Sequence, residues 1–361
     1  MLKRDAMMPN GGDFRALAPV VEAIGRAAMF GGLGTLAGLL HFTPVMANDS
    51  SASLDAGGLQ LVQNNDIRLE SEDLYLSLKE IRVTYRFRNS SSYDVSTLVA
   101  FPLPVMWIGE EGNYVLDGSD PINVVDFQVA VDGQRVVPSV EVKATRAGVD
   151  VTDVLKRYGI PLTMQAGDTK AYVAQIDRLD QLPGDAQHEL EHYGVVDWVT
   201  SSGTDGKPRA NVHWNAHITF YWFQVFPAGR AIEVTHRYHP VPRHFFFGED
   251  DLAASAGMRK TYCIDAAFDR SARAELKLPS QEFEVLAGRE LKYVLTTAGN
   301  WLGPIGKFRL TVDKSTPDAL VSLCAHGIKR TGPTTFELSR DNYRPAEDLK
   351  VLFVEPLSKA D

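Results

Sequence analysis

The sequence predicts a mainly β protein: an antiparallel β-sandwich with a helical insertion, followed by a second, smaller β-rich domain. Two observations lead to this fold class. From residue 58 onward, runs that alternate branched or aromatic residues with polar ones recur, and a period of two is typical of half-buried strands. Between about residues 145 and 206 the period of the apolar residues lengthens towards 3.6, which indicates helices.

Two pairs of strands are expected in the N-terminal half. Residues 81–87 (IRVTYRF) and 95–101 (VSTLVAF) flank the polar stretch 89–92, so we predict a hairpin. Residues 124–131 and 136–142 flank an Asp-Gly dipeptide, which is a common hairpin turn. This half of the chain is therefore predicted to be antiparallel β.

Three short helices are predicted in the insertion, over residues 150–158, 169–179 and 185–193. Gly159 and Gly194 follow the first and the third of them, and glycine just after the last helical turn is a common stop signal. The stretch from about 145 to 206 is thus expected to form a helical insertion between strands of the sandwich.

The most aromatic segment of the chain is predicted to be a central strand. In residues 212–227 (VHWNAHITFYWFQVFP) apolar side chains occupy both faces, so both faces should be covered. A turn at 227–230 leads into residues 231–238, which we expect to pair antiparallel with this strand. Residues 240–251, with three consecutive phenylalanines, are expected to be an irregular linker.

The second β-rich domain is expected over residues 251–361, after a sandwich domain over residues 48–250. Its predicted elements are a helix at 265–276 and strands at 291–296, 308–312, 335–338 and 349–354.

Residues 1–47 are predicted to be a secretory signal peptide. Basic residues precede the apolar run 27–40, and the small residues of V-M-A place a cleavage site after Ala47. The alternative is an uncleaved membrane anchor, because no charge occurs between Arg26 and Asp49, but glycines and a proline in that stretch favour cleavage. Cleavage would leave 33 basic and 43 acidic side chains, a net charge of -10, in the periplasm or outside the cell.

Composition excludes several classes of protein. The 361 residues carry a net charge of -9, which excludes a broadly basic protein that coats nucleic acid. Apolar residues at 44% and charged residues at 23% are average for folded soluble domains and exclude disordered or collagen-like chains. After residue 48 we find no dinucleotide fingerprint, Walker loop, nucleophile elbow or second apolar run of 18 residues, so neither a cofactor nor a transmembrane segment of the mature chain is expected.

Cys263 and Cys324 are the only cysteines of the chain. In an exported protein a lone pair of cysteines most often forms a structural disulfide, which we predict here. About 62 residues lie in the closed loop, and the chain-entropy estimate for such a loop is roughly 4 kcal/mol of stabilisation. The alternative is a nucleophilic Cys324 with His326 two residues on, for which no orienting motif is present.

Residues 188–192 match the H-E-x-x-H pattern of zinc hydrolases. On a helix His188 and His192 share one face and could bind zinc, with Glu189 as the general base. The predicted helix is short, Glu191 is charged, and no third ligand is indicated. A zinc-dependent hydrolase is therefore kept as the alternative function, beside a simpler interpretation as a solvated helix face.

Aromatic and histidine residues concentrate between positions 213 and 244. The five histidines there could form a surface copper or zinc site, although packing beside aromatic residues is the simpler interpretation. We take the following residues as the candidate binding region: Trp214, Tyr221, Trp222 and His236.

Several stretches, taken in order, resemble an uncharacterised family of secreted bacterial proteins, domain of unknown function family 4424. The resembling pieces are residues 47–51 and 57–59, 81–87, 221–222, 226–229, 236–238, 262–265, 293–297, 301 and 303–310, and Pro345, Asp348 and Leu349. The resemblance implies export from a bacterial cell and a mostly β architecture. It implies no activity or catalytic residue, and the pattern at residues 188–192 is not among the shared features.

The sequence therefore predicts an exported, non-enzymatic binding or scaffolding protein of the bacterial envelope. Its partner is expected to be an envelope protein, a glycan or a lipid, and not a nucleic acid.

Overall fold

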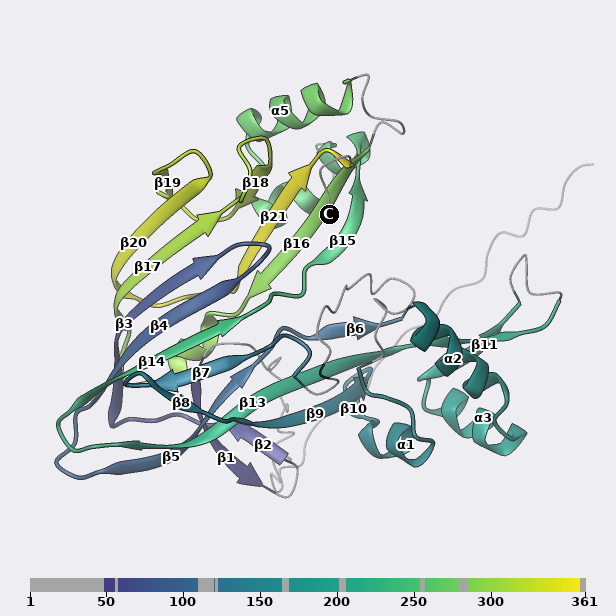
Figure 1. Ribbon diagram of the computed structural model, residues 1–361, viewed down its shortest axis with the longest axis horizontal. Coiled ribbons are helices and arrows are strands. Elements are labelled where there is room, and N and C mark those ends of the chain that lie inside the picture. Colours follow the sequence, from purple (N-terminus) through teal and green to yellow (C-terminus); the bar gives the residue numbers. More distant parts are fainter. Residues whose placement is uncertain are drawn as a thin grey trace, which may run out of the picture. The chain divides into compact units, whose positions relative to one another are not determined.

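The computed structural model describes residues 49–55, 58–109, 120, 123–163, 169–200, 206–253, 257–278 and 285–357. In these ranges the chain is mainly β (Figure 1), which confirms the predicted fold class. The segment predicted as a signal peptide, and its cleavage site after Ala47, lie outside the described residues. In the described part no helix is long and apolar enough to cross a membrane.

One sheet has seven strands in the order β10-β9-β13-β5-β1-β2, with β6 also paired to β13. The bounds of its strands are β1 Ser50–Asp55, β2 Gly58–Leu61, β5 Val95–Pro102, β6 Met106–Ile108, β9 Ser139–Arg146, β10 Val149–Asp150 and β13 Trp214–Phe226.

A second sheet has eight strands in the order β19-β20-β17-β3-β4-β14-β7-β8. The bounds of its strands are β3 Ile67–Leu76, β4 Ile81–Asn89, β7 Gln128–Val131, β8 Gln134–Val136, β14 Ala231–Tyr238, β17 Ile305–Asp313, β19 Lys329–Arg330 and β20 Thr335–Tyr343.

Two smaller sheets and the helices complete the described part. The four-stranded sheet runs β15-β16-β21-β18, and the two-stranded sheet is β11-β12. Their bounds are β15 Arg243–Phe247, β16 Leu286–Tyr293, β18 Leu320–Leu323, β21 Leu349–Glu355, β11 Val196–Val199 and β12 Arg209–Val212. The helices are α1 Thr152–Arg157, α2 Thr169–Asp180, α3 Gly184–His192, α4 Gly257–Tyr262 and α5 Ala266–Leu276, with 3-10 turns η1 Glu249–Leu252 and η2 Thr296–Asn300.

Aromatic side chains join the seven-stranded and the eight-stranded sheet. In β4 every second side chain is buried, as an alternating strand with one face in the core requires. Phe127 stacks on Phe220 of β13 at 4.4 Å between ring centroids, and Phe87 of β4 packs edge-on against Phe226 at 5.9 Å. The two large sheets therefore pack through their inner faces, as in a sandwich.

Two predicted hairpins are wrong, because the chain changes sheet at both turns. β4 pairs with β14, whereas β5 pairs with β13, so 81–87 does not pair with 95–101 and 212–227 does not pair with 231–238. Asn89 lies where the two crossings meet. Its side-chain amide donates to the carbonyl oxygens of Tyr93 at 2.7 Å and Phe226 at 2.8 Å.

Other predicted elements are found close to their expected positions. The helices α1, α2 and α3 lie between β10 and β11, which is the predicted helical insertion. Gly159 and Gly194, with φ of +62° and +65°, follow α1 and α3 as the predicted stops. The Asp-Gly hairpin is present between β7 and β8, but its second strand ends at Val136. The rest of the predicted strand 136–142 is wrong as a hairpin partner, because β9 pairs with β13 in the seven-stranded sheet.

The predicted linker at 240–251 is wrong in part, because it contains a strand. β15 pairs antiparallel with β16. Phe247 is fully buried while its neighbour Phe246 is 73% exposed, so the three consecutive phenylalanines alternate between core and solvent as strand residues do.

Cys263 and Cys324 form a disulfide with a Cα–Cα distance of 5.0 Å. Because both sulfurs are joined, Cys324 carries no free thiol, and the alternative of a nucleophilic Cys324 with His326 is not supported.

One sheet contains strands from both sides of residue 250. β3 and β17 pair in parallel, with Lys307 beside Ser71. The division of residues 48–361 into two domains stays a prediction, and any test of it has to account for this pairing. The junction is tight, since a Cβ added at Gly306 would lie 2.4 Å from the carbonyl oxygen of Glu70.

We expect Gly306→Ala to destabilise the protein, because backbone and not a flexible side chain occupies the space that the new methyl group needs. Overpacking of this kind costs about 1–3 kcal/mol. Gly299→Ala is the matched control, since nothing lies within 4 Å of its added Cβ. Urea unfolding of both variants measures the difference, and equal stabilities would contradict the tight β3–β17 junction.

Candidate functional site

The residues of the H-E-x-x-H pattern lie on the exposed part of α3. The His188 side chain is 82% exposed, and its Nδ1 lies 3.4 Å from the carboxylate of Glu191. His192 is exposed and packs against Tyr193. The carboxylate of Glu189 is bound by Arg157 and accepts a hydrogen bond from the hydroxyl of Tyr158.

No zinc site is supported by these contacts. Among the residues that the structure describes, no three His, Cys, Asp or Glu side chains are grouped so that they could hold a metal ion. Glu189 serves as the partner of a guanidinium instead, and hydrogen bonds from the Tyr158 hydroxyl and Arg157 lower its pKa despite some desolvation.

The five histidines between 213 and 244 have separate environments. His213 shares a hydrogen bond with the carboxylate of Asp197, and His217 shares a hydrogen bond of 2.9 Å with the hydroxyl of Thr145. His236 is buried, His239 is exposed and His244 is partly exposed. The proposed surface copper or zinc site is therefore not assembled from them.

The candidate binding region of the sequence is part of the core. Trp214, Trp222 and His236 are 0%, 4% and 2% exposed, and only Tyr221 lies partly open to solvent. The rings of Trp222 and His236 meet edge-on at 5.5 Å across the two sheets. Trp214 donates from Nε1 to the carbonyl oxygen of Leu162 at 2.8 Å. These side chains stabilise the sandwich and do not line an open cleft.

A layer of buried polar side chains lies beside His236. Asp49 is fully buried, and its Oδ1 lies 3.5 Å from Nε2 of His236, which is beyond good hydrogen-bond geometry. The hydroxyls of Tyr85 and Tyr293 share a hydrogen bond of 2.9 Å, and Tyr293 also donates to Glu72 at 3.4 Å. The layer thus joins β1, β3, β4, β14 and β16.

Burial changes the charge states in this layer. Desolvation lowers the pKa of His236 to about 3, so its imidazole is neutral at pH 7. Desolvation, with the nearby charge of Glu72, raises the pKa of Asp49 well above its ordinary value. The Asp49–His236 contact is therefore best described as a contact between two groups that both favour their neutral forms.

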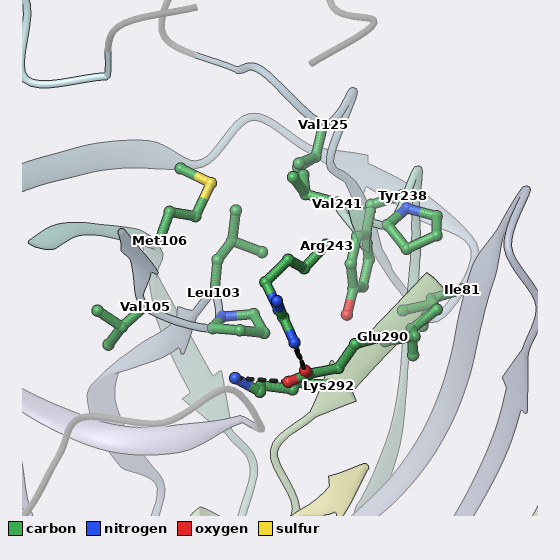
Figure 2. A pocket seen from close by; sticks show the side chains of 13 residues that line it. Ile81, Leu103, Val105, Met106, Val125, Tyr238, Val241, Arg243, Glu290 and Lys292 are labelled. Atoms are coloured by element: carbon green, nitrogen blue, oxygen red, sulfur yellow. Dashed lines mark hydrogen bonds and ion pairs between the residues drawn. The ribbon is translucent and has the colours of Figure 1, made fainter. Parts of the chain in front are cut away.

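An open pocket lies at the end of the same strand, two residues beyond His236 (Figure 2). Its apolar lining comes from the start of β4, the segment around β6, the β14–β15 connection and β16: Ile81, Leu103, Pro104, Val105, Met106, Val125, Pro240, Val241 and Leu291. Its polar lining residues are Tyr238, Arg243, Glu290 and Lys292. We call this space the apolar pocket.

Strand register brings the three charged side chains of the apolar pocket together. Arg243 and Glu290 are directly opposite in the β15–β16 pair, and Lys292 follows on the same face of β16. Nη2 of Arg243 donates to Oε2 of Glu290 at 3.0 Å, and Nζ of Lys292 donates to Oε1 at 2.7 Å. Figure 2 shows both cations converging on the one carboxylate.

Glu290 remains ionised although its side chain is only 7% exposed. Desolvation alone would raise its pKa, but hydrogen bonds from Lys292, Tyr262 and Arg243 outweigh it, and the pKa is lowered. Arg243 is held from the other side as well, with its guanidinium 4.9 Å from the ring centroid of Phe245. The charged cluster is thus fixed in place and carries one net positive charge.

Tyr238 adds a buried hydroxyl to the wall of the apolar pocket. Its OH has no hydrogen-bond partner among the described residues, and burial raises its pKa, so it stays protonated. The space between the lining side chains is about 510 Å³ with its opening, of which about 30 Å³ is wide enough for the centre of a water molecule. Such a pocket fits a narrow apolar group whose polar end meets fixed charges.

Sequence reasoning missed these polar residues. Arg243 falls in the segment predicted to be a linker, and Tyr238 was assigned to a strand of another sheet. A signal was nevertheless present at Glu290 and Lys292, since two opposite charges two residues apart share one face of a strand. That pattern alone does not tell which apolar segments surround it.

Comparison with known protein families gives a match over most of the chain. The model of the family described as Domain of unknown function (DUF4424) matches residues 47–352. No curated protein matches the sequence.

Two solved structures are similar to this chain. One is a protein of Legionella pneumophila subsp. pneumophila str. Philadelphia 1 that is named for nutrient binding; the alignment covers 85% of this chain and 71% of that one, at 14% identity and a TM-score of 0.39. The other is an M1 zinc metallopeptidase from Deinococcus radiodurans; it covers 81% of this chain and 43% of that one, at 9% identity and a TM-score of 0.23.

We expect His236 to make stability depend on pH. Its folded-state pKa of about 3 is below the unfolded value near 6.5, so the unfolded state binds the proton first and stability falls as pH drops from about 6.5 towards 3. At pH 4 the loss is roughly 3 kcal/mol, whereas Asp49, with a raised pKa, acts in the opposite direction.

The measurement is urea unfolding of the protein and of His236→Gln at pH 7, 5 and 4. The variant should lose less stability between pH 7 and pH 4 than the unchanged protein. His239→Gln, at an exposed position on the same segment, should leave the pH dependence as it is. Parallel pH curves for all three proteins would refute the assignment.

Proposed function

Because the chain belongs to the DUF4424 family, whose description assigns no activity, we propose a function from its own residues. The protein is an exported, non-enzymatic binding protein of the bacterial envelope. Its ligand is a small amphiphile with a narrow apolar chain and an anionic head group, which enters the apolar pocket.

The charges of the apolar pocket carry this proposal. Arg243 and Lys292 bring two positive charges to one carboxylate, so the cluster has an excess positive charge beside an otherwise apolar lining. An anionic head group would complete the pairing, and guanidinium groups bind carboxylates with directed, charge-assisted hydrogen bonds. The uncharged hydroxyl of Tyr238 supplies one further donor in the wall.

The apolar lining supports a hydrocarbon chain as the other end of the ligand. A polymethylene chain is the narrowest apolar group, and each buried methylene contributes about 0.8 kcal/mol. Since little of the space is wider than a water molecule, binding requires side chains at the rim to change rotamer. Met106 has a long, unbranched side chain that is suited to this.

The polar lining residues support binding more than catalysis. A general acid or base needs a pKa near the working pH, whereas Glu290 is held ionised by its hydrogen bonds and Tyr238 is held protonated by burial. Export is supported by the signal-like residues 1–47 and by the Cys263–Cys324 disulfide, because such bonds persist in oxidising compartments.

We expect a bacterial host that expresses the full chain to export it with Asn48 as its first residue. N-terminal sequencing and intact mass of protein recovered from the periplasm or the medium check this. A chain found in the cytoplasm, or one that retains residues 1–47, would contradict the proposed export and cleavage.

We expect dodecanoate to bind the purified protein in isothermal titration calorimetry, and Arg243→Gln to weaken that binding about tenfold or more, because a charge-assisted hydrogen bond is lost. Lys292→Gln should act in the same direction. Dodecyltrimethylammonium, with the same chain and a cationic head, should bind more weakly than dodecanoate.

Arg82→Gln is the matched control for this experiment. Arg82 also pairs with a glutamate and lies 4.5 Å from a tyrosine ring centroid, but it is outside the apolar pocket. Its removal should leave the affinity unchanged. Absence of dodecanoate binding, or equal losses in all three variants, would refute the proposed ligand class.

A further inference from the structure

A second hollow lies on the outer face of the eight-stranded sheet, and it shares no residue with the apolar pocket. Side chains from β3, β4 and β17 contribute to it, and its volume is about 1040 Å³ with its opening. The lining residues that matter here are Arg68, Glu70, Ser71, Arg86, Arg88 and Lys307. We call it the basic hollow.

Strand register places a short side chain between two cations. Lys307 of β17 is opposite Ser71 of β3, and Ser71 is opposite Arg86 of β4. Neighbouring strands are about 4.8 Å apart, so the backbone positions of the two cations are separated by roughly 10 Å across the serine. An oxyanion seated above Ser71 could therefore receive donors from three strands.

The basic hollow carries more positive charge than its own residues neutralise. Glu70 is its one carboxylate, and it binds Arg86 at 3.0 Å and also Arg88, each through the guanidinium Nε. Within the described residues the side chains of Arg68 and Lys307 make no hydrogen bond or ion pair, although their backbones are paired in the sheet. The lining residues thus carry an excess of three positive charges, on a protein whose net charge is -9. The carboxylates of the flanking strands stand outside the hollow, with Asp341 of β20 opposite Lys307 and Glu233 of β14 opposite Arg86.

The clustering of these cations is unfavourable for folding. Arg68 and Arg88 are directly opposite in the β3–β4 pair, and like charges at such positions are destabilising. One row further along the same face of the sheet, the cation is paired with carboxylates. There Arg309 of β17 pairs with Asp73 at 3.5 Å and with Glu337 at 3.2 Å. Around Ser71 the positive charge is therefore concentrated over β3, β4 and β17, while the carboxylates of the same row, Asp341 and Glu233, lie on the outer neighbours β20 and β14.

The floor of the basic hollow is built from backbone. The β3–β4 register shifts between Leu69 and Ser71, which leaves Glu70 as an extra residue in β3. Gly306 packs directly against the carbonyl group of Glu70, with no room for a side chain. Small residues in the floor and long cations at the rim make a concave site whose donors converge.

We propose that the basic hollow binds a phosphate group. Arg86 and Arg88 are held by Glu70 through Nε, and Nη1 of Arg88 donates to the carbonyl oxygen of Gly229, which leaves both Nη atoms of Arg86 and Nη2 of Arg88 for a ligand. Lys307 and the Ser71 hydroxyl approach from the neighbouring strands. Donors on three sides and the positive excess of the lining residues match the several oxygens of a tetrahedral phosphate group better than a planar carboxylate, which has two oxygens.

The phosphate can be that of a free anion or that of a phospholipid head group, and two binding assays distinguish the sources. Calorimetry with inorganic pyrophosphate tests the free anion. Co-sedimentation with vesicles of phosphatidylglycerol and phosphatidylcholine, against vesicles of phosphatidylcholine alone, tests the head group. Both use the mature chain, with Lys307→Gln and Arg68→Gln as variants and Arg309→Gln as the control on the same face.

We expect binding in at least one assay, weakened about tenfold or more by Lys307→Gln and by Arg68→Gln, and unchanged by Arg309→Gln. Binding of pyrophosphate with this pattern assigns the site to a free phosphate ligand. Binding of phosphatidylglycerol vesicles alone with this pattern assigns it to the membrane surface. Binding in neither assay, or equal losses in all three variants, overturns the proposal, and neither result depends on the apolar pocket.

Discussion

The fold depends on one constraint: the chain has to change sheet twice at the same place. β4 leads into β5 and β13 leads into β14, and each of these crossings connects the two large sheets. The side chain of Asn89 holds both crossings, because its amide donates to Tyr93 and to Phe226. A buried amide with two carbonyl partners is a satisfied polar group, and losing it would leave two carbonyl oxygens without their donor. The crossings place β14 against β4, and the face of β14 that carries His236 against the aromatic face of β13.

Both candidate sites follow from this placement. β14 runs beside β4 and ends at Tyr238, which lines the apolar pocket. The chain then continues into β15, where Arg243 is opposite Glu290. The same β4 carries Arg86 and Arg88 on its outer face, opposite β3. One strand therefore contributes buried aromatic residues to the core and cations to the solvent face. Cations outnumber carboxylates among the lining residues of both sites, by two to one in the apolar pocket and by four to one in the basic hollow.

The sequence patterns predicted where strands and helices lie more accurately than they predicted which strands pair. Alternation in residues 81–87 shows which side chains are buried, since it reflects a strand with one face in the core. It contains no information about whether the next strand returns beside it or crosses to another sheet, and so the pairing of 95–101 was wrong. The apolar pocket could not be predicted for a related reason, because Tyr238, Arg243 and Glu290 come from three strands that only tertiary packing brings together. Cys263 and Cys324 needed no such information, because two cysteines allow a single pairing.

Hydrogen–deuterium exchange with and without dodecanoate tests the central claim, that the apolar pocket is the ligand site, most directly. The account predicts slower exchange on ligand binding in residues 103–106, 239–243 and 286–293, which line the pocket or connect its strands, and no change in α3, which carries the histidine motif. Slower exchange confined to other segments, or identical exchange with and without ligand at a saturating concentration, would contradict it.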